Sequence, residues 1–230
     1  MKVWCVVPAA GVGARMCSTL PKAYLPIAGK KLIEITLNTL LTVSAIEKIV
    51  VVVSEQDQHW SQLALAQHAQ IITVIGGEER YHSVFNGLMQ LQPFAQPHDW
   101  VLVHDVARPC ITPADIQHLI HQCDNHPVGG LLARPMTDTV KCRQEKTLQV
   151  ENTLDRQLLW AALTPQCFRF ELLKTALQQV IVHNKKVTDE SHAVELLGHH
   201  PLLIEGDARN IKVTYPSDLA LAENILAGVL

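Results

Sequence analysis

The stretch KVWCVVPAAGVGARM, residues 2–16, decides the fold. Its first half, Lys2 to Pro8, is almost continuously apolar, as the buried strands of parallel sheets are. Its second half is a loop of small residues, in which the backbone can approach a ligand closely and its amides can cradle a phosphate or a base. The stretch therefore predicts a buried strand that leads directly into a ligand-binding loop.

The two glycines of this loop, Gly11 and Gly13, do not complete a familiar nucleotide fingerprint. A dinucleotide-binding loop needs a third glycine where the helix packs on the strand, and position 16 is Met. It also needs an acidic ribose partner after the second strand, which is missing at the required spacing. No Gly-Lys-Ser/Thr follows either, so the loop is not a Walker A loop. The sequence thus disfavours a dinucleotide oxidoreductase.

Outward from this stretch, short apolar runs alternate with longer amphipathic segments, the pattern of a parallel sheet covered by crossover helices. The predicted strands are 2–8, 48–54, 71–75, 100–104 and 129–133. The predicted helices are 32–43, 56–68, 81–91, 113–123, 171–183, 190–197 and 218–226. We therefore expect a three-layer α/β/α, Rossmann-like fold with a mostly parallel sheet.

Composition narrows the function classes. With 230 residues, of which 48% are hydrophobic, the chain suits one large domain over residues 1–230. With a formal net charge of −3, the chain has no excess of positive charge to bind nucleic-acid phosphates, so we expect no nucleic-acid partner. No apolar run approaches the length that spans a bilayer and no signal-peptide core follows Met1, so we expect no membrane association and a cytoplasmic protein.

Cysteines and histidines suggest no metal centre. The six cysteines lie far apart without a Cys-x-x-Cys pair, which predicts reduced thiols; they are Cys5, Cys17, Cys110, Cys123, Cys142 and Cys167. His118 and His121 could share one helical face, but no carboxylate or thiol completes a zinc set. We interpret these histidines as surface residues. The sequence does not indicate whether Cys17 or Cys110 is reactive.

The segment 138–153 departs from the alternating pattern. It is polar, rich in Thr, Lys and Glu, and too weakly apolar on any face to form a core strand or helix. A surface loop is the simplest interpretation, but loops of this length in compact domains are often functional. We expect an excursion from the domain.

Two cations and one carboxylate point to phosphate chemistry. Arg15 lies in the small-residue loop and Lys22 follows it in the segment LPKAYLP; fixed cations can stabilise the charge that develops on a nucleotide α-phosphate under attack. Asp105 follows a buried strand in the segment HDVARP, at the sheet edge where ligands of open α/β folds bind. An aspartate beside a triphosphate suits Mg²⁺. Alternatively, Arg15 and Lys22 are solvated surface charges, and Asp105 caps a helix or pairs with Arg108.

The motifs PAAGVGARM, LPKAYLPI, GGEERYHSV, HDVARP, LTPQ, TDE and NIKVT, in this order, closely resemble the 2-C-methyl-D-erythritol 4-phosphate cytidylyltransferases of the non-mevalonate isoprenoid pathway. The resemblance covers essentially the whole chain. It implies a nucleotidyltransferase fold with a protruding β-arm, and a transferase that joins the acceptor to CTP with release of pyrophosphate. Mg²⁺ is the implied cofactor.

The resemblance also implies roles for individual residues. Arg15, Lys22 and Lys212 would be the catalytic cations, and Asp105 would hold the metal. The nucleotide would lie against Pro8, Ala9, Ala10, Gly11, Gly77 and Ser83. The acceptor would contact Asp105, Arg108, Thr139, Arg156, Thr164 and Thr188. Three positions differ from the family pattern: Ala14, His82 and Val106.

In this family the excursion 138–153 is a β-arm that interlocks with the arm of a second subunit. The resemblance therefore implies a homodimer in which Thr139 and Arg156 serve the partner's active site. From the residues alone, Arg156 could instead pair with Asp155, and Thr139 could cap a turn.

Two alternatives stay open from the sequence. A ribitol-5-phosphate cytidylyltransferase would share the nucleotide half and differ around Thr139, Arg156 and Thr188. A catalytically silent CTP-binding sensor would keep the fold, but such a protein is expected to lose a phosphate-binding cation, and Arg15, Lys22 and Lys212 are all present.

Overall fold

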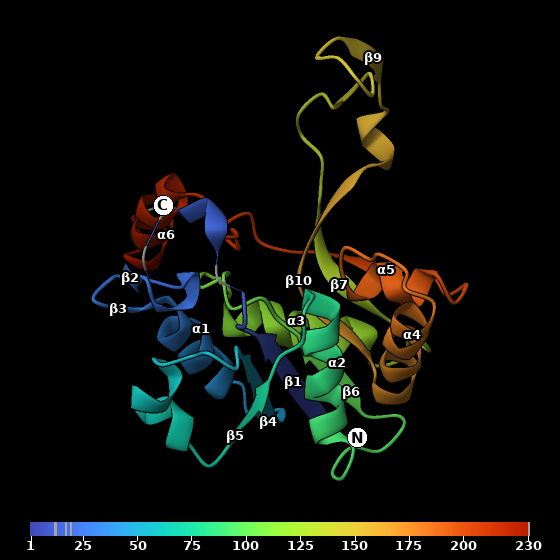
Figure 1. Ribbon diagram of the computed structural model, residues 1–230. Coiled ribbons are helices and arrows are strands. Elements are labelled where there is room, and N and C mark those ends of the chain that lie inside the picture. Colours follow the sequence, from blue (N-terminus) through green and yellow to red (C-terminus); the bar gives the residue numbers. More distant parts are fainter. Residues whose placement is uncertain (12, 17, 19, 230) are drawn as a thin grey trace.

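The computed structural model describes residues 1–11, 13–16, 18 and 20–229, and the prediction about Cys17 falls outside them. A seven-stranded sheet forms its centre, in the order β11-β7-β10-β6-β1-β4-β5 (Figure 1). The strands are β1 (Val3–Pro8), β4 (Ile46–Val53), β5 (Ile71–Ile75), β6 (Trp100–Val103), β7 (Gly129–Pro135), β10 (Trp160–Arg169) and β11 (Leu202–Glu205). Only β10 runs antiparallel to its neighbours, β6 and β7. The mostly parallel sheet predicted from the sequence is confirmed.

Helices cover both faces of this sheet. They are α1 (Leu32–Leu41), α2 (Arg80–Leu91), α3 (Pro113–Cys123), α4 (Phe170–Val182), α5 (Glu190–Glu195) and α6 (Pro216–Leu226). Alternate residues of β1 point to opposite faces. Cys5 packs with α1, α3 and α6 on one face, and Val6 packs with α2, α4 and α5 on the other. This division gives the three layers of the expected α/β/α fold.

Most sequence predictions agree with the structure to within a few residues, but one helix was wrong. The segment 56–68 forms two 3-10 turns, η3 (Trp60–Gln62) and η4 (Ala64–Gln67), instead of one α-helix. Asp57 explains the start of this segment, because its Oδ1 accepts hydrogen bonds from the amides of His59 and Trp60, both at 2.8 Å. A side chain that binds these amides competes with regular helical bonding.

Two strands of the central sheet, β10 and β11, and a short separate ribbon were not predicted. The short ribbon of β2 (Pro26–Ile27) and β3 (Lys30–Lys31) lies beside α1. Strand β11 has one exposed side, since its residues Leu203 and Glu205 are exposed. Strand β10 begins with the exposed residues 160–162 and becomes buried only from Leu163 onward, so its sequence shows no uniform pattern.

The segment 138–153 lies in a β-arm that protrudes from the sheet (Figure 1). Its tip is an antiparallel ribbon of β8 (Lys141–Arg143) and β9 (Val150–Thr153), and the return to β10 passes through η5 (Arg156–Leu158). Leu148 is 93% exposed and Leu158 is 80% exposed. The arm therefore has no hydrophobic core of its own within this chain.

Within the described part of the chain, no helix is both long and apolar enough to cross a membrane. The described cysteines Cys5, Cys110, Cys123, Cys142 and Cys167 are all free thiols. Burial raises the pKa of Cys110 to about 11, which makes a reactive thiolate at this position unfavourable.

Candidate active site

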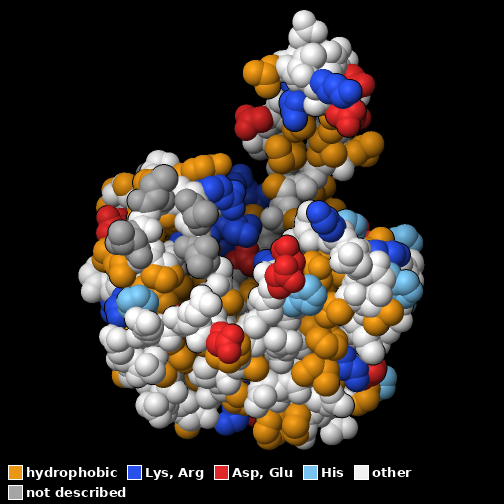
Figure 2. Space-filling view, viewed as in Figure 1, with side chains coloured by type: hydrophobic (Ala, Val, Ile, Leu, Met, Phe, Trp, Pro, Cys, Tyr) orange, Lys and Arg blue, Asp and Glu red, His pale blue; other side chains and the backbone are white. Residues whose placement is uncertain are grey.

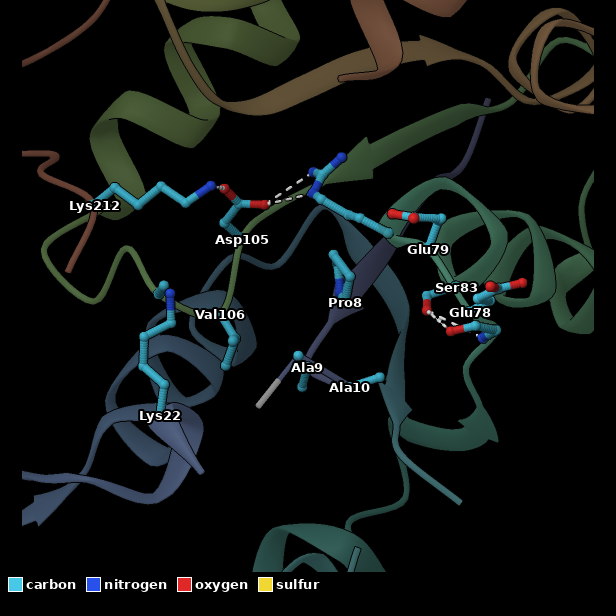
Figure 3. Close-up of a pocket in the computed structure, with 14 residues that line it drawn as sticks. Pro8, Ala9, Ala10, Lys22, Glu78, Glu79, Ser83, Asp105, Val106 and Lys212 are labelled. Carbon is cyan, nitrogen blue, oxygen red and sulfur yellow. Dashed lines mark hydrogen bonds and ion pairs between the residues drawn. The ribbon is translucent and has the colours of Figure 1, made fainter. Parts of the chain in front are cut away.

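A pocket with a volume of about 200 Å³ opens at the carboxyl ends of β1 and β6 (Figure 3). Its lining brings together residues from five of the motifs quoted above: PAAGVGARM, LPKAYLPI, GGEERYHSV, HDVARP and NIKVT. The residues that line it are Pro8, Ala9, Ala10, Gly11, Lys22, Gly77, Glu78, Glu79, Arg80, Ser83, Asp105, Val106, Ala107 and Lys212. All six predicted nucleotide-binding residues are therefore in one cavity with Lys22, Lys212 and Asp105.

Two glycines allow close packing at this pocket, Gly77 in its lining and Gly13 against the lining residue Lys22. At Gly77, an added Cβ would lie 2.5 Å from the Cβ of His82, so no side chain fits. Gly13 has a φ of +70°, and an added Cβ would lie 2.6 Å from the Cβ of Lys22. Glycine adopts this conformation without a steric cost and lets the loop pack directly against Lys22. The hydroxyl of Ser83 accepts a hydrogen bond from the amide of Gly77 at 3.2 Å and holds Gly77 in place.

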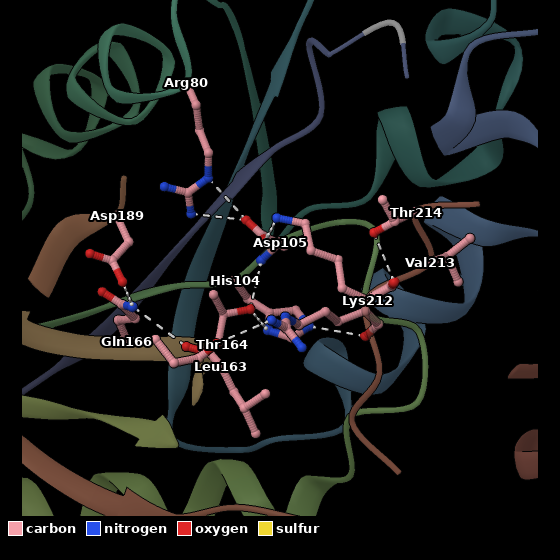
Figure 4. A network of polar contacts seen from close by, with 12 residues as sticks. Arg80, His104, Asp105, Leu163, Thr164, Gln166, Asp189, Lys212, Val213 and Thr214 are labelled. Carbon is pink, nitrogen blue, oxygen red and sulfur yellow. Dashed lines mark hydrogen bonds and ion pairs between the residues drawn. The ribbon is translucent and has the colours of Figure 1, made fainter. Parts of the chain in front are cut away.

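Asp105 is the buried acidic centre of the site, and it is surrounded by cations (Figure 4). Its Oδ2 lies 2.7 Å from Lys212 Nζ, and its Oδ1 lies 2.9 Å from Arg80 Nη2. Burial by itself raises the pKa of Asp105, but Arg80 and Lys212 outweigh it and hold the pKa well below its usual range. Asp105 is therefore ionised at neutral pH.

Lys22 and Arg15 supply positive charge on the other side of the pocket. The ammonium of Lys22 donates a hydrogen bond to the carbonyl of Val213 at 3.2 Å. Burial, together with the neighbouring charges of Lys212 and Arg15, lowers the pKa of Lys22. Arg15 is exposed outside the pocket lining, with its guanidinium 5.9 Å from the ring centroid of Tyr215. On the face that Figure 2 shows, Lys and Arg side chains gather at the hollow beneath the arm.

Arg80 and Glu190 were not predicted as site residues, although both lie inside the motifs GGEERYHSV and TDE. Arg80 Nη1 lies 2.6 Å from Glu190 Oε1, and Arg80 Nη2 lies 3.1 Å from Glu190 Oε2. Burial raises the pKa of Glu190, and the facing guanidinium opposes that rise. Their positions could have indicated a role, because Arg80 directly precedes one predicted helix and Glu190 is the first residue of another. Their meeting across the sheet edge was not visible in the sequence.

A buried histidine holds the strand end that carries Asp105. His104 Nε2 lies 3.2 Å from the carbonyl of Arg108, and its Nδ1 lies 3.0 Å from the hydroxyl of Thr164. That hydroxyl also accepts a hydrogen bond from the amide of Asp105 at 3.1 Å. Burial lowers the pKa of His104 to about 4, so the ring is neutral and donates from Nε2 to the carbonyl. Thr164 therefore positions the backbone of Asp105.

A second, smaller pocket adjoins the first. Its volume is about 130 Å³, and Arg80, Asp105 and Lys212 line both pockets. The remaining lining residues are Arg108, Ala162, Leu163, Thr164, Gln166, Thr188 and Asp189. Three predicted acceptor-binding residues, Arg108, Thr164 and Thr188, thus meet beside Asp105.

The other two predicted acceptor-binding residues lie elsewhere. Thr139 and Arg156 are exposed on the β-arm, and neither lines either pocket of its own chain. The guanidinium of Arg156 donates a hydrogen bond to the carbonyl of Thr137, also on the arm. Arg156 does not pair with Asp155, whose carboxylate accepts from the amide of Gln157 at 3.0 Å.

Asp105 suits a magnesium ion that takes one ligand from the protein and others from a nucleotide. Among the residues that the structure describes, no three His, Cys, Asp or Glu side chains gather to hold a metal. Mg²⁺ needs no such cage, because it accepts one or two carboxylates and completes its octahedron with phosphate oxygens and water. Both oxygens of Asp105 contact cations, so a metal at this position has to compete with Arg80 and Lys212.

The fold and the site together define the class of protein. A mostly parallel α/β sheet presents an ionised aspartate, several cations and a small-residue loop at its carboxyl edge, and this is a nucleotidyltransferase. The model of the family "2-C-methyl-D-erythritol 4-phosphate cytidylyltransferase" matches residues 3–228, and the chain belongs to this family.

Similar proteins agree with this assignment. A 2-C-methyl-D-erythritol 4-phosphate cytidylyltransferase of Vibrio vulnificus (strain CMCP6) is 49% identical over 96% of this chain and 93% of its own. The crystal structure of the Francisella tularensis protein of that name is 33% identical, with a TM-score of 0.85 over 98% of this chain and 100% of the other. A solved 4-diphosphocytidyl-2C-methyl-D-erythritol synthase is 38% identical, with a TM-score of 0.83 over 98% of both chains.

Proposed function

We propose that this protein transfers the cytidylyl group of CTP to 2-C-methyl-D-erythritol 4-phosphate. The products are 4-diphosphocytidyl-2-C-methyl-D-erythritol and pyrophosphate. The observation that carries the proposal is the pair of adjoining pockets with Asp105, Arg80 and Lys212 as their common wall, in a chain of this family. One pocket offers small residues and cations to a nucleotide, and the other offers Arg108, Thr164 and Thr188 to a phosphorylated polyol.

The chemistry is one in-line displacement. A phosphate oxygen of the acceptor attacks the α-phosphorus of CTP, and the bond from that phosphorus to the oxygen bridging the β-phosphate breaks. Pyrophosphate leaves with the electron pair. No general base is needed, because the acceptor phosphate is already ionised at neutral pH. Positioning and charge neutralisation therefore carry most of the catalysis.

The cations of the site have distinct proposed tasks. Arg15 and Lys22 bind the triphosphate and stabilise the transition state, and Lys212 reaches the α-phosphate region. The half-buried position of Lys22 beside the loop supports its role, since a charge in a partly desolvated place acts more strongly than one in water. Pro8, Ala9, Ala10, Gly11, Gly77 and Ser83 receive the cytidine.

Asp105 is the proposed ligand of Mg²⁺. The ion would supply positive charge to the phosphate oxygens and orient the triphosphate. His104 and Thr164 hold the Asp105 backbone in place for this purpose. A cytoplasmic location belongs to the same proposal, because both substrates are charged and water-soluble.

The acceptor site is proposed to be completed by a second subunit. Thr139 and Arg156 lie on the arm and away from the pockets of their own chain, and the apolar side chains of Leu148, Val150 and Leu158 are exposed. A homodimer with interlocked arms accounts for both features. Each arm would then bring Thr139 and Arg156 to the acceptor pocket of the other chain.

The two alternatives are less well supported. The family model and the similar proteins carry the methylerythritol name, which favours this acceptor over ribitol 5-phosphate. A silent CTP-binding sensor does not explain why Lys22, Lys212 and Asp105 all converge on one pocket.

The test is an assay of pyrophosphate release. Purified protein is incubated with MgCl₂, one nucleotide and either methylerythritol 4-phosphate or ribitol 5-phosphate, with ATP, GTP and UTP as controls for CTP. Release that requires both CTP and methylerythritol phosphate is the expected result. Preference for ribitol phosphate would overturn the acceptor assignment, and no release with any pair would favour the sensor.

A further inference from the structure

The guanidinium of Arg80 bridges two carboxylates that come from distant parts of the chain (Figure 4 shows its bonds to Asp105). Its Nε donates to Asp105 Oδ1 at 3.0 Å, and its Nη2 lies 2.9 Å from the same oxygen. Its Nη1 and Nη2 also form a fork with the two oxygens of Glu190, at 2.6 and 3.1 Å. Arg80 therefore uses all three of its nitrogens to hold both acids at once.

The two carboxylates depend on Arg80 to different degrees. Glu190 is 0% exposed, and among the described residues its one ion pair is with Arg80. Asp105 has a second partner in Lys212, whose side chain is 40% exposed. An ionised carboxylate inside a protein is costly without a partner. Arg80 can therefore release Asp105 far more easily than it can release Glu190.

A metal at Asp105 has to displace part of this arrangement, because Arg80 occupies Oδ1. We infer that Arg80 is a positioning residue that holds the Asp105 carboxylate until the metal–nucleotide complex binds, and then withdraws onto Glu190. Glu190 makes the exchange possible, since it keeps the displaced guanidinium paired. The inference rests on the proposed function, and it assigns to Arg80 and Glu190 control of metal binding at the site.

The exchange also joins the two pockets. Glu190 is the first residue of α5 and directly follows Thr188 and Asp189, which line the acceptor pocket. Gln166 ties this segment to β10: its Nε2 donates to Asp189 Oδ2 at 2.9 Å, and its Oε1 accepts from the amide of Ser191 at 2.8 Å. When the Arg80 guanidinium pairs with Glu190 alone, it therefore contacts the segment 188–190, which contributes Thr188 and Asp189 to the acceptor pocket.

The test measures how much a metal strengthens CTP binding, without any turnover. The dissociation constant of CTP is determined by equilibrium dialysis with EDTA and again with saturating Mn²⁺, and the ratio of the two constants gives the metal enhancement. The ratio cancels effects of a substitution on metal-free CTP binding. Asp105→Asn serves as the reference for a lost metal ligand and should bring the ratio close to one.

Glu190→Gln removes the anchor, so Arg80 depends on Asp105 alone and a bound metal leaves the guanidinium unpaired. The metal enhancement is expected to fall about tenfold, the scale of one charge-assisted contact. Arg80→Lys keeps the charge but cannot hold both acids, and its ammonium is expected to remain with the buried Glu190. Asp105 is then free for the metal, and the enhancement should rise about threefold, a small change in free energy.

The lysine variant separates the exchange from a general effect of charge. A field effect predicts no change for Arg80→Lys, because the net charge is the same, so an unchanged or lower enhancement would overturn the inference. An enhancement in Glu190→Gln within twofold of the wild type would overturn it too. If Glu190→Gln does not fold, Arg80→Lys decides alone.

Glu171→Gln is the matched control, because Glu171 forms an exposed pair with Lys174 outside both pockets; it should leave the ratio unchanged. The outcome is separate from that of the proposed function. An unmodified protein that releases no pyrophosphate from CTP and methylerythritol phosphate contradicts the function. An active protein whose variants keep the wild-type enhancement contradicts only the role of Arg80 and Glu190.

Discussion

The pocket proposed to bind the nucleotide and the β-arm are built in opposite ways. The pocket is lined by residues from five separate motifs, and both carboxylate oxygens of its buried Asp105 contact cations of the same chain. The arm is a two-stranded ribbon whose apolar residues Leu148 and Leu158 face solvent. An isolated two-stranded ribbon is marginal at best in water. The pocket is thus formed within a single chain, whereas we propose that the arm is covered by a second subunit.

Because of this difference, the proposed reaction depends both on the fold of each chain and on the contact between two chains. The groups that act on the nucleotide are positioned by the sheet edge, whereas two of the groups proposed to hold the acceptor are positioned by the arm. Loss of a pocket residue should therefore damage every chain separately. Loss of an arm residue should damage the neighbouring chain, and this contrast can be tested.

The largest expected effect is that of Lys22→Ala. The substitution removes a partly buried charge that acts on the transition state, so turnover should fall on the order of a hundredfold or more. The measurement is kcat for pyrophosphate release with saturating CTP, acceptor and Mg²⁺. Lys30→Ala is the control, because Lys30 is an exposed lysine on β3 outside the pocket. A turnover number equal to that of the wild type would reject the catalytic role of Lys22.

The next effect tests whether the arms are exchanged. Arg15→Ala damages the nucleotide side of its own chain, and Arg156→Ala damages the acceptor side of the partner. In a randomly mixed population, half of the molecules are mixed dimers with one intact site, so activity should recover to about a quarter of the wild-type value. The measurement is pyrophosphate release after the two variants are unfolded and refolded together.

Each variant refolded alone is the control for this mixture and should stay nearly inactive. Mixed dimers can be confirmed by two different affinity tags. If confirmed mixed dimers show no recovery, each chain completes its own acceptor site, and the division between pocket and arm is wrong.

The same contrast explains what the sequence could and could not predict. The core strands β1, β4 and β6 were predictable because parallel strands buried on both faces are continuously apolar. Part of the pocket lining was predictable because Ala9 to Gly11 follow β1 and Asp105 follows β6. Strand β10 was not, since it is exposed over 160–162 and buried only from Leu163 onward.

Contacts between residues far apart in the chain are the main feature that the sequence did not predict. Arg80 and Glu190 are 110 positions apart in the chain, and only the fold brings their charges to the same edge. Thr164 was predicted as an acceptor ligand, but its hydroxyl is engaged by His104 and by the amide of Asp105. A sequence shows which residues are near a strand end, whereas it does not show which hydrogen bonds they have already made.

A smaller effect compares thiols of the two regions. Cys142 is half-buried on the arm, whereas Cys110 is buried and its pKa is raised to about 11. Iodoacetamide reacts with the thiolate, so at pH 8 Cys142 should be alkylated at least about tenfold faster than Cys110. Peptide mass mapping over time measures both rates and follows Cys17 separately. Equal rates would contradict the difference in burial between Cys142 and Cys110. Slower alkylation of Cys142 at higher protein concentration is expected if the arms interlock.

The smallest expected effect separates association from folding. Leu148→Ser removes an apolar side chain that is 93% exposed in the single chain, so the free energy of unfolding of the monomer should change by less than about 0.5 kcal/mol. If a partner arm covers this side chain, the same substitution loses buried apolar area, and the dimer dissociation constant should rise several-fold, by about three- to tenfold. Sedimentation velocity over a dilution series measures the constant.

Val182→Ser, a change at an exposed valine on α4, is the control and should alter neither quantity. A dissociation constant that Leu148→Ser leaves unchanged, with Leu158→Ser equally silent, would mean that the apolar side chains of the arm do not form the contact between subunits.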